Sequence, residues 1–521
     1  MNTSTTITPN ESNPQEYGPQ PIELTTSNSK DDQHNVNNND NCLNENNHSI
    51  ITRSITRSIT RSTTTISHQS SSLHLLDDPS KFPDGWNNRA MITLFGSFLG
   101  MIGSLGYVNS GGVIQSYIST NILINDSQSS IGWIFSIYNF FAFGGILISG
   151  IIFDKFGCKI PIFVGVIIMF SGLLATSFCH SLYQFILAYS ILAGLGTAFV
   201  FGPFVACLSH YFLHKRALVI GISYTGGGLG GVIYPLMCRS LFSKIGYGWT
   251  MRIGAFISLF CCGIGWLLVS DRHEEFSPDL EKKKKKKKIN QEITTTSSNN
   301  SVIDRVENEF ISIIKEIFHS IDFKILYKNL LFTVLVFGLL FNGIVFLISI
   351  VQLPSYAISH GFSEQQSYLL LVVFNSFSIP GRIIPSYFAD QGLGRFNTFC
   401  LINCFSLIAF VVIWLPFGNH LTALFIFAGC FGFSSGSVLS LTASLVASIV
   451  KTSDVGKGLG TAFFILSIAD LFGIPIAGAI ASGSKQSYNN LVYFLTACAA
   501  IGAIVSFISR YLYGGFNLNR V

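Results

Sequence analysis

The sequence predicts an all-α membrane protein whose twelve transmembrane helices form two six-helix bundles. Charged residues make up 11% of the 521 residues and hydrophobic residues 49%, whereas soluble domains are about 25% charged. The apolar residues form runs long enough to cross about 30 Å of hydrocarbon. A charged segment at 150–159 also has a weaker copy at 386–395. The composition therefore excludes a water-soluble fold, and the repeat indicates two related halves.

The chain begins with a polar segment, residues 1–85, in which Asn, Ser and Thr predominate. Such a composition buries too little apolar surface to fold alone, so we predict a disordered tail. The segment lacks a basic start followed by an apolar stretch. The first membrane span is therefore expected to direct insertion.

Six apolar runs occupy the first half, residues 86–271, and six occupy the second half, residues 328–513. The first six predicted helices lie near 89–118, 130–153, 160–178, 183–210, 216–242 and 250–270. The second six lie near 328–357, 366–388, 397–416, 421–449, 457–481 and 491–512. Residues 272–327 form a polar linker between the halves, and residues 514–521 form a short tail.

The distribution of cations predicts the orientation. Positive residues gather on one side of the predicted layout, which the positive-inside rule makes cytoplasmic together with both termini and the linker. This side holds Lys155, Lys159, Lys215, Arg216, Arg272, Lys282 through Lys288, Arg395, Lys451 and Lys457. The opposite side holds little beyond Lys244, Arg252 and Lys485.

The linker has two features of its own. Seven consecutive lysines, Lys282–Lys288, either contact anionic lipid at about 1 kcal/mol per Lys or form a solvated tether. Residues 302–325 have apolar side chains at helical spacing. This pattern predicts an amphipathic helix at the membrane surface.

In each copy of the charged segment an apolar run ends at an Asp, a Gly-containing turn follows, and a cation precedes the next run. The first copy contains Gly150, Asp154, Lys155, Gly157 and Lys159; the second contains Asp390 and Arg395, with Ser386 in place of the first Gly. We predict that both are conformational loops that hold helix ends together. The first is expected to be the tighter latch, because it keeps the Gly and has the shorter turn.

Two charges lie inside predicted spans, where each costs about 2.5–3.5 kcal/mol at the bilayer centre. Arg382 comes eight residues before Asp390 and shares a helix face with Asn375 and Ser378, so we expect it to face a central cavity. Asp470 either pairs with Arg382 or carries a proton. Arg239, at the outer end of the fifth span, is expected to snorkel to the interface.

No stretch of the sequence has the pattern of an enzyme site. The glycines at 226–231 match G-x-G-x-x-G, but no strand precedes them and no acidic residue follows at the dinucleotide-binding offset. There is no P-loop, and the eleven Cys lack metal-ligand spacing. We expect no enzymatic activity, no cofactor, no metal and no nucleic-acid partner. Transport would then run downhill or on an ion gradient.

The loop at 150–159 resembles the signature between the second and third helices of the major facilitator superfamily. Further strings resemble the fungal branch of its monocarboxylate-transporter family and extend the likeness over about residues 80–515. They include Phe95-Gly96-Ser97-Phe98-Leu99-Gly100, Gln115-Ser116-Tyr117-Ile118, Trp133-Ile134-Phe135-Ser136-Ile137-Tyr138, Gly381-Arg382, Tyr387-Phe388-Ala389-Asp390 and Gly394-Arg395-Phe396-Asn397. The resemblance implies a major facilitator fold whose two bundles rock about a central site.

Two departures from the family pattern bear on the substrate. Animal proton-coupled carriers of this family have a Lys on the first helix and an Asp four residues before the eighth-helix Arg, and these places here are Asn109 and Ser378. This chain therefore has the eighth-helix Arg of the family, as Arg382, but lacks the Lys and the Asp that the resemblance would imply for a proton-and-carboxylate mechanism. The fungal branch also includes a plasma-membrane riboflavin transporter, which this chain resembles in the first helix.

We therefore expect a secondary transporter at the plasma membrane, functional as a monomer, that moves a small organic solute, with riboflavin uptake by facilitated diffusion as the first choice. A neutral, flat, polyhydroxylated solute needs aromatic faces and amide or hydroxyl partners. Candidate contacts, which ordinary interhelical hydrogen bonds would explain equally well, are Tyr107, Asn109, Gln115, Tyr138, Asn139, Tyr224, Asn342, Asn375, Ser378 and Arg382. The alternatives are a proton-coupled monocarboxylate transporter, a transporter-like nutrient sensor, and a vacuolar or other internal membrane.

Overall fold

A computed structural model of the chain describes residue 82 and residues 87–276, 324–481 and 485–515, all within one compact unit, Ser67–Val521. In these ranges the chain forms helices and turns, without a strand. The predicted tail apart from Phe82, the run Lys282–Lys288 and all but the last two residues of the predicted amphipathic helix at 302–325 lie outside them. Those three interpretations stay predictions.

Helices of the first half follow the predicted apolar runs. The first span consists of α2 (Asn88–Gly103) and α3 (Leu105–Asn121), and the second of α4 (Gln128–Gly144) and α5 (Ile146–Phe156). Next come α6 (Lys159–Thr176) and a span built from α7 (Leu182–Phe185), the π-helix η2 (Ile186–Ala193) and α8 (Gly194–Leu208). The half ends with α9 (Arg216–Leu268) and the short α10 (His273–Phe276).

The long helix α9 contains the fifth and sixth predicted spans. The chain reverses at Gly246, whose φ of 76° and ψ of 174° belong to a region that only glycine adopts readily. In the described ranges eleven helices are long and apolar enough to cross a membrane. Because α9 counts as two of the predicted spans, the twelve predicted helices are confirmed.

The second half begins with α13 (Lys324–Lys328), α14 (Leu330–Ser359) and α15 (Glu364–Phe388). The π-helix η3 (Ala389–Leu393), α16 (Arg395–Ile408), the π-helix η4 (Ala409–Trp414) and α17 (Leu415–Phe417) follow. The last elements are α18 (Leu421–Ile449), the 3-10 turn η5 (Thr452–Asp454), α19 (Val455–Ile480) and α20 (Lys485–Gly514). Polar caps begin several of these helices; the Ser363 hydroxyl, for example, accepts from the Gln366 N–H ahead of α15.

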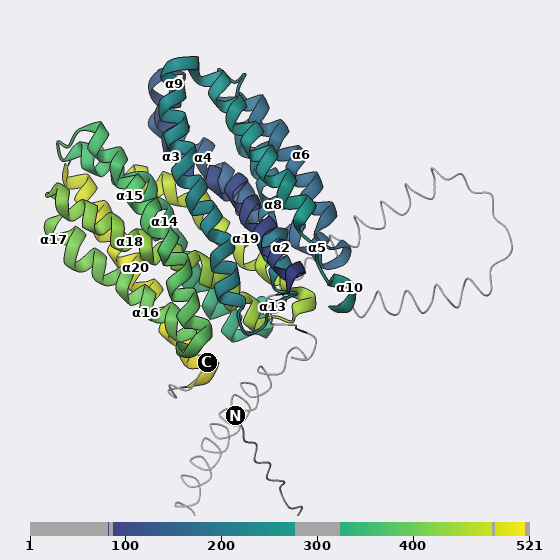
Figure 1. Cartoon of the computed structure of the whole chain (residues 1–521). Coiled ribbons are helices and arrows are strands. Elements are labelled where there is room, and N and C mark those ends of the chain that lie inside the picture. The colour runs from purple at the N-terminus through teal and green to yellow at the C-terminus, as the bar shows by residue number, and fades with distance from the viewer. Residues whose placement is uncertain (1–81, 83–86, 277–323, 482–484, 516–521) are drawn as a thin grey trace, which may run out of the picture. The chain divides into compact units, whose positions relative to one another are not determined.

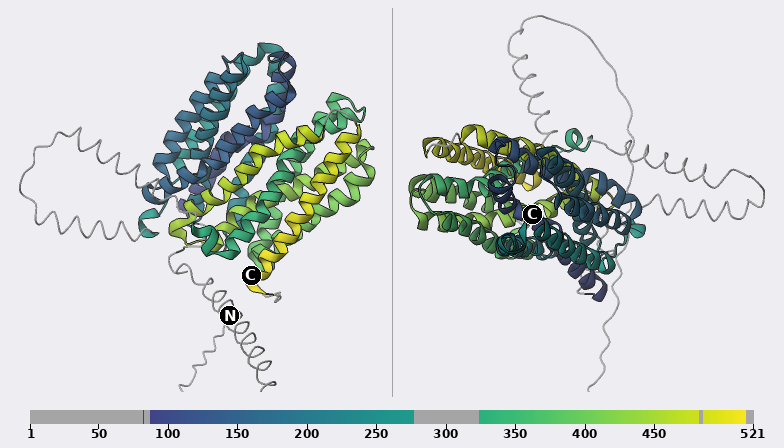
Figure 2. Two further views of the ribbon diagram at one scale, coloured as in Figure 1. Left: turned by 180° about the vertical axis from the view of Figure 1, so that it is seen from behind. Right: turned by 90° about the horizontal axis from the view of Figure 1, so that it is seen from above.

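The two halves meet along a few long helices. α4 and α5 pack against α19, and α9 packs against α15 and α18. Figures 1 and 2 show the first-half helices (blue to teal) grouped beside the second-half helices (green to yellow). The groups diverge toward the end where α9 turns at Gly246, here called the open end (Figure 1). The opposite end, which holds the loops at 150–159 and 386–395, is called the closed end.

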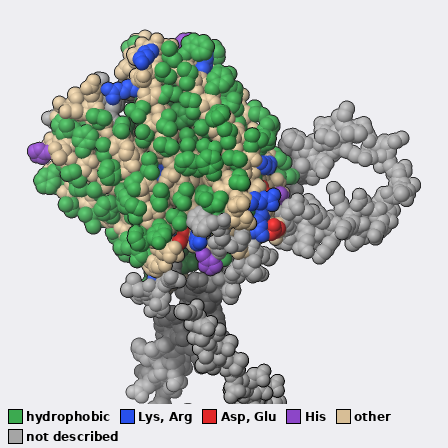
Figure 3. Space-filling model, viewed as in Figure 1, with side chains coloured by type: hydrophobic (Ala, Val, Ile, Leu, Met, Phe, Trp, Pro, Cys, Tyr) green, Lys and Arg blue, Asp and Glu red, His purple; other side chains and the backbone are tan. Residues whose placement is uncertain are grey.

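The outer surface is the surface of a membrane protein. Large apolar side chains are exposed along the helices, among them Phe260 at 68% and Leu267 at 67% exposure. Figure 3 shows hydrophobic side chains covering one face between the two ends, while Lys and Arg side chains gather near the ends. Such a surface requires lipid in place of water over most of its area.

Candidate transport cavity and closed end

A cavity of about 590 Å³ lies between the two halves and reaches the open end. Residues of α3, α4, α9, α14, α15 and α19 form its wall. At its deeper part the polar wall residues are Asn109, Asn139 and Asn375, and nearer the open end they are Gln115, Ser116, Tyr117, Thr120, Asn121, Arg239, Ser243 and Gln365. Its size is within the range of about 300–1,000 Å³ that is typical of small-molecule sites.

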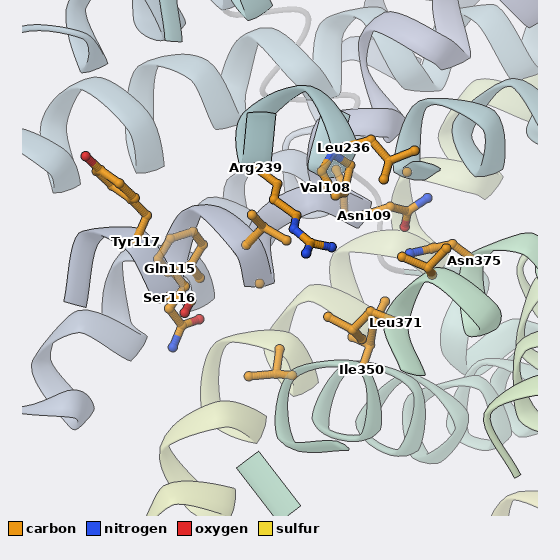
Figure 4. A pocket seen from close by; sticks show the side chains of 18 of the residues that line it. Val108, Asn109, Gln115, Ser116, Tyr117, Leu236, Arg239, Ile350, Leu371 and Asn375 are labelled. Atoms are coloured by element: carbon orange, nitrogen blue, oxygen red, sulfur yellow. The ribbon is translucent and has the colours of Figure 1, made fainter. Parts of the chain in front are cut away.

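Three amide side chains line the deeper part. Asn109 donates from Nδ2 to the Gly227 carbonyl at 3.0 Å, which leaves its Oδ1 as an acceptor. Asn139 is 7% exposed, and its Oδ1 has no hydrogen-bond partner among the described residues. Asn375 is also buried, and Figure 4 shows it beside Asn109 at the cavity wall. A buried amide oxygen without a partner favours a cargo that can hydrogen-bond to it.

Aromatic rings form another part of the wall. The rings of Tyr138 and Tyr189 stack with centroids 4.5 Å apart and planes 17° from parallel. The Tyr138 hydroxyl is 3.0 Å from the Thr197 hydroxyl, and Phe135 packs against Tyr189 at 5.5 Å. Because the hydroxyl is held on α8, the Tyr138 ring presents a fixed face to the cavity.

Prolines add backbone acceptors to the wall. Pro235 of α9 cannot donate a helical hydrogen bond to the carbonyl of Gly231, and Pro354 of α14 cannot donate to that of Ile350. Both Gly231 and Ile350 line the cavity. The wall therefore combines amide groups, aromatic faces and backbone carbonyls.

A smaller cavity of about 60 Å³ lies beside the first and shares Val108, Asn139 and Leu347 with it. Asp470 of α19 lines this space together with Asn342 of α14. The Asp470 carboxylate is 6% exposed and forms no ion pair or hydrogen bond with any residue that the structure describes. The predicted pair with Arg382 is therefore absent from this conformation.

Arg382 does not line either of these cavities, contrary to the expectation from the sequence. It is 2% exposed, and its guanidinium donates to the Tyr224 carbonyl of the other half. Gly228 leaves space for this contact, since a Cβ there would lie 3.1 Å from the Arg382 Nη1. The predicted depth brings the side chain to the seam between α9 and α15, which is closed here.

Four further candidate contacts also lie away from the main cavity. Tyr107 stacks on Tyr234 with ring centroids 4.5 Å apart, and Ser378 donates to the Asn375 carbonyl at 2.7 Å. Asn342 donates to the Gly338 carbonyl of its own helix, and the Tyr224 ring is buried among apolar residues. Of the candidates, the main cavity brings together Asn109, Gln115, Tyr138, Asn139 and Asn375.

At the closed end the first charged loop joins the two halves through Asp154. Its carboxylate accepts from the N–H groups of Gly456 at 2.9 Å and Lys457 at 2.8 Å, in the first turn of α19. Gly150 lets the backbones touch, because a Cβ there would lie 2.2 Å from the Gly456 carbonyl oxygen. The carboxylate therefore caps a helix of the opposite half, where the helix dipole also favours it.

The remaining residues of the first loop serve its own half. Lys155 lies in the last turn of α5, and Gly157 (φ 77°) separates α5 from α6. Lys159 donates to the Trp266 carbonyl at 2.6 Å. The loop is thereby tied to the end of α9.

A cluster of polar side chains braces this loop. The Asp271 carboxylate accepts from the Cys158 N–H and lies 2.7 Å from the His273 Nδ1. Burial alone would raise the pKa of Asp271, but the hydrogen bonds from His273 and Cys158 hold it well below its usual range. Burial lowers the pKa of His210, stacked between Phe153 and Phe276, to about 4. His210 is therefore neutral at physiological pH.

The second loop joins the halves through Asp390 and Arg395. Asp390 accepts from the Leu218 N–H in the first turn of α9 at 2.8 Å and from the Arg395 Nε at 3.1 Å. Arg395 also donates to the Leu213 carbonyl and to the Ser448 hydroxyl, both at 2.7 Å. The predicted longer turn is wrong, because η3 winds residues 389–393 and only Gly394 separates it from α16. Since both loops make two bonds across the halves, the expectation of a tighter first latch is not met.

The sequence interpretation missed two arginines. Arg216 is 1% exposed and donates across the halves to the Ala447 carbonyl at 2.6 Å and to the Thr452 hydroxyl at 3.1 Å. Arg239 is the only charged residue among the described residues that line the main cavity, although we expected it to snorkel. In the sequence each of these arginines lies next to a helix end. Nothing in that pattern distinguishes an arginine that bonds across the halves or lines the cavity from one at the membrane surface.

Comparisons with known proteins agree with this architecture. The sequence profile of the Major Facilitator Superfamily matches residues 91–419. The riboflavin transporter MCH5 of Saccharomyces cerevisiae is 32% identical over 455 residues, which cover 85% of this chain and 82% of that protein. The agnestins efflux protein AgnL12 of Paecilomyces divaricatus is 30% identical over 422 residues, or 81% of this chain and 87% of that protein.

A solved structure extends the likeness to the fold. The proton:xylose symporter XylE, bound to 6-bromo-6-deoxy-D-glucose, matches with a TM-score of 0.57 at 14% identity, over 83% of this chain and 96% of that one. The matched regions span both halves of the helical body. The chain therefore belongs to the Major Facilitator Superfamily, and it is a multi-pass membrane transporter of the secondary type and not an enzyme.

Proposed function

We propose that this transporter moves riboflavin or a related flavin into the cell across the plasma membrane, by facilitated diffusion. The observation that carries the proposal is the cavity wall, which includes three amide side chains and a stacked tyrosine pair, and to which no acidic side chain among the described residues contributes. Riboflavin is neutral, flat and polyhydroxylated. It therefore needs the ring faces and hydrogen-bonding groups that this wall offers.

The wall supplies enough interactions for a useful affinity. Each neutral hydrogen bond contributes about 0.5–1.5 kcal/mol net, and an aromatic pair about 0.5–1.5 kcal/mol beyond the area that it buries. Asn109, Asn139 and Asn375 together with Tyr138 would thus contribute about 2–6 kcal/mol. Burial of the ring system adds to this, and a Kd near 1 μM corresponds to about 8 kcal/mol.

The name of one relative supports riboflavin as the cargo, whereas none of the relatives described above has a name that states uptake. MCH5 is by its name a riboflavin transporter, and the chain is similar to it over both halves. AgnL12 is by its name an efflux protein for agnestins, so the family members that resemble this chain differ in cargo. Uptake and the plasma membrane are therefore part of the proposal.

The closed end is proposed to face the cytoplasm. The cations Lys159, Arg216 and Arg395 lie there, which agrees with the positive-inside rule. The conformation described here would then be open to the outside. Release of cargo into the cell requires Asp154 and Asp390 to leave their helix ends while the open end closes.

Uptake of labelled riboflavin by cells that lack their own carrier tests the proposal. We expect accumulation that saturates, and a KM about 10-fold higher for Asn139→Ala, because a buried hydrogen bond to the cargo is lost. Asn490→Ala is the matched control, since Asn490 is exposed and does not line the cavity. If riboflavin uptake stays at the background while labelled lactate or pyruvate accumulates, the flavin proposal is wrong.

A proton-coupled monocarboxylate transporter is the second candidate, and Asp470 favours it. Carboxylates without a partner cation inside the membrane are expensive and commonly mark proton-carrying sites. Facilitated diffusion predicts uptake that changes little with external pH and survives Asp470→Asn. Uptake that rises at acidic external pH and loses this dependence in Asp470→Asn would establish coupling in its place.

A further inference from the structure

We infer that Arg239 binds the cargo at the outer part of the cavity, through a pair of neighbouring acceptor atoms that lie in one plane. The inference rests on the proposed function and deepens it, because it names the chemical group by which the cargo is held. Two sources of such a pair fit the proposals above: a carbonyl oxygen of a flavin ring with the ring nitrogen next to it, and the two oxygens of the carboxylate of a small organic acid.

The side chain is placed to meet a cargo. Arg239 belongs to α9, lines the main cavity and is exposed there. Figure 4 shows its guanidinium extending into the space bordered by Asn109, Asn375 and Leu371. It forms no ion pair or hydrogen bond with any residue that the structure describes. A guanidinium that only snorkelled would point away from the cavity, toward the headgroups.

The charges around Arg239 leave it uncompensated. No acidic residue lines the cavity among the described residues. Of the other cations at this end, Arg252 is held by the Ser177 hydroxyl at 3.1 Å and lies over the rings of Phe178 and Trp249, at 4.4 and 4.9 Å. Lys244 is exposed and does not line the cavity. Among the residues that the structure describes, Arg239 is therefore the one positive charge that an entering solute meets within the cavity.

The geometry of a guanidinium selects what it binds. Its N–H groups form a planar fork that matches two coplanar acceptor atoms, and it cannot accept a hydrogen bond. Three residues further along α9 on the cavity wall, the Phe242 ring stacks on Tyr117 with centroids 4.0 Å apart. A flat cargo held by the fork can thus lie along aromatic surface while its other end reaches the inner amides. A lysine would keep the charge but lose the fork.

Binding to the purified full-length protein tests this inference. Arg239→Gln removes the charge, and Arg239→Lys keeps it without the fork. Lys244→Gln is the matched control, because it removes a cation from the same end without touching the cavity. One arm of the experiment titrates riboflavin and follows the quenching of its fluorescence, and the other measures the displacement of riboflavin, or a thermal shift, by pyruvate and benzoate.

We expect Arg239→Gln to weaken binding by about 10-fold or more, the usual effect of losing a charged hydrogen bond, and Arg239→Lys to recover only part of it. Lys244→Gln should match the wild type. Riboflavin binding that is equal in wild type, Arg239→Gln and Lys244→Gln overturns the inference and leaves the flavin proposal standing.

The two proposals can also separate in the opposite direction. Pyruvate or benzoate binding that depends on Arg239, without any binding of riboflavin, supports the inference and refutes the flavin cargo. If Arg239→Gln weakens the binding of none of these probes, the inference is wrong.

Discussion

The two charged loops close the same end of the transporter by different means. In the first, Asp154 caps α19 with two backbone bonds, and Gly150 lies against the backbone of Gly456. In the second, Asp390 makes one such bond to α9, while Arg395 both pairs with it and reaches the opposite half. The first contact thus depends on the absence of a side chain and the second on a charge. Two copies of one motif have therefore become sensitive to different substitutions.

The largest effect is expected from adding one methyl group to the first loop. Gly150→Ala places a Cβ about 2.2 Å from the Gly456 carbonyl oxygen, and backbone cannot move aside easily. Overpacking of this kind costs about 1–3 kcal/mol, so the closed end should form about 10-fold less often and uptake should fall similarly. Uptake normalised to the amount of protein in the membrane measures this.

The matching change in the second loop should be mild. Ser386 already has a side chain, and its hydroxyl lies 3.2 Å from that of Ser440, so Ser386→Ala loses about 1 kcal/mol at most. Gly263→Ala is the control for Gly150→Ala, because a Cβ on Gly263 meets no atom within 4 Å. Equal uptake by Gly150→Ala and Gly263→Ala would show that the backbone contact does not limit closure.

An effect of comparable size is expected from removing the cation of the second loop, and a smaller one from removing that of the first. Arg395→Gln loses the Leu213 bond between halves and leaves Asp390 without its cation, whereas Lys159→Gln loses a bond only within the first half. Loss of a charged hydrogen bond costs about 1.5–3 kcal/mol, so Arg395→Gln should slow uptake several-fold more than Lys159→Gln. A larger loss in Lys159→Gln would reverse the comparison. Uptake assays of both variants, with Arg395→Lys as the charge-conserving partner, decide it.

The last comparison concerns the thermal stability that the glycines at the loops provide. Gly157 and Gly394 have φ of 77° and 82°, in a region where other residues cost about 1–3 kcal/mol. Gly157→Ala should lower the melting temperature more than Gly394→Ala, because a Cβ at 157 would also lie 2.5 Å from the Asp271 carboxylate. Thermal unfolding of both purified variants tests the order. Equal melting temperatures would mean that the side chains around Asp271 shift enough to accommodate the added methyl group.

The membrane spans were predictable because long apolar runs permit few other structures. α18, for instance, has the predicted bounds, 421–449. The turn at Gly246 could not be located as closely, since α9 remains wound on both sides of it. The composition of a segment predicts that a helix is present. The position where a span ends depends on which single residue adopts non-helical backbone angles.

The cavity was predictable only in part. Polar residues in apolar runs led to Asn109, Asn139 and Asn375, which line the cavity, but the same reasoning included Ser378, whose hydroxyl bonds to its own helix. Such residues look alike in a sequence, because a backbone carbonyl one turn away satisfies a hydroxyl as well as a cargo does. The surroundings of Arg382 could not be predicted, since the packing of α9 on α15 decides what a face of α15 meets.

The one-residue turn at Gly246 has a mechanical consequence. Between the fifth and sixth spans no loop is present that could fold over the entrance of the cavity as a lid. The turn is also too short to let one span move independently of the other. The pair must tilt as a stiff hairpin, and Arg239 must travel with it. A cargo bound to that guanidinium would then move inward in the same conformational change that closes the open end.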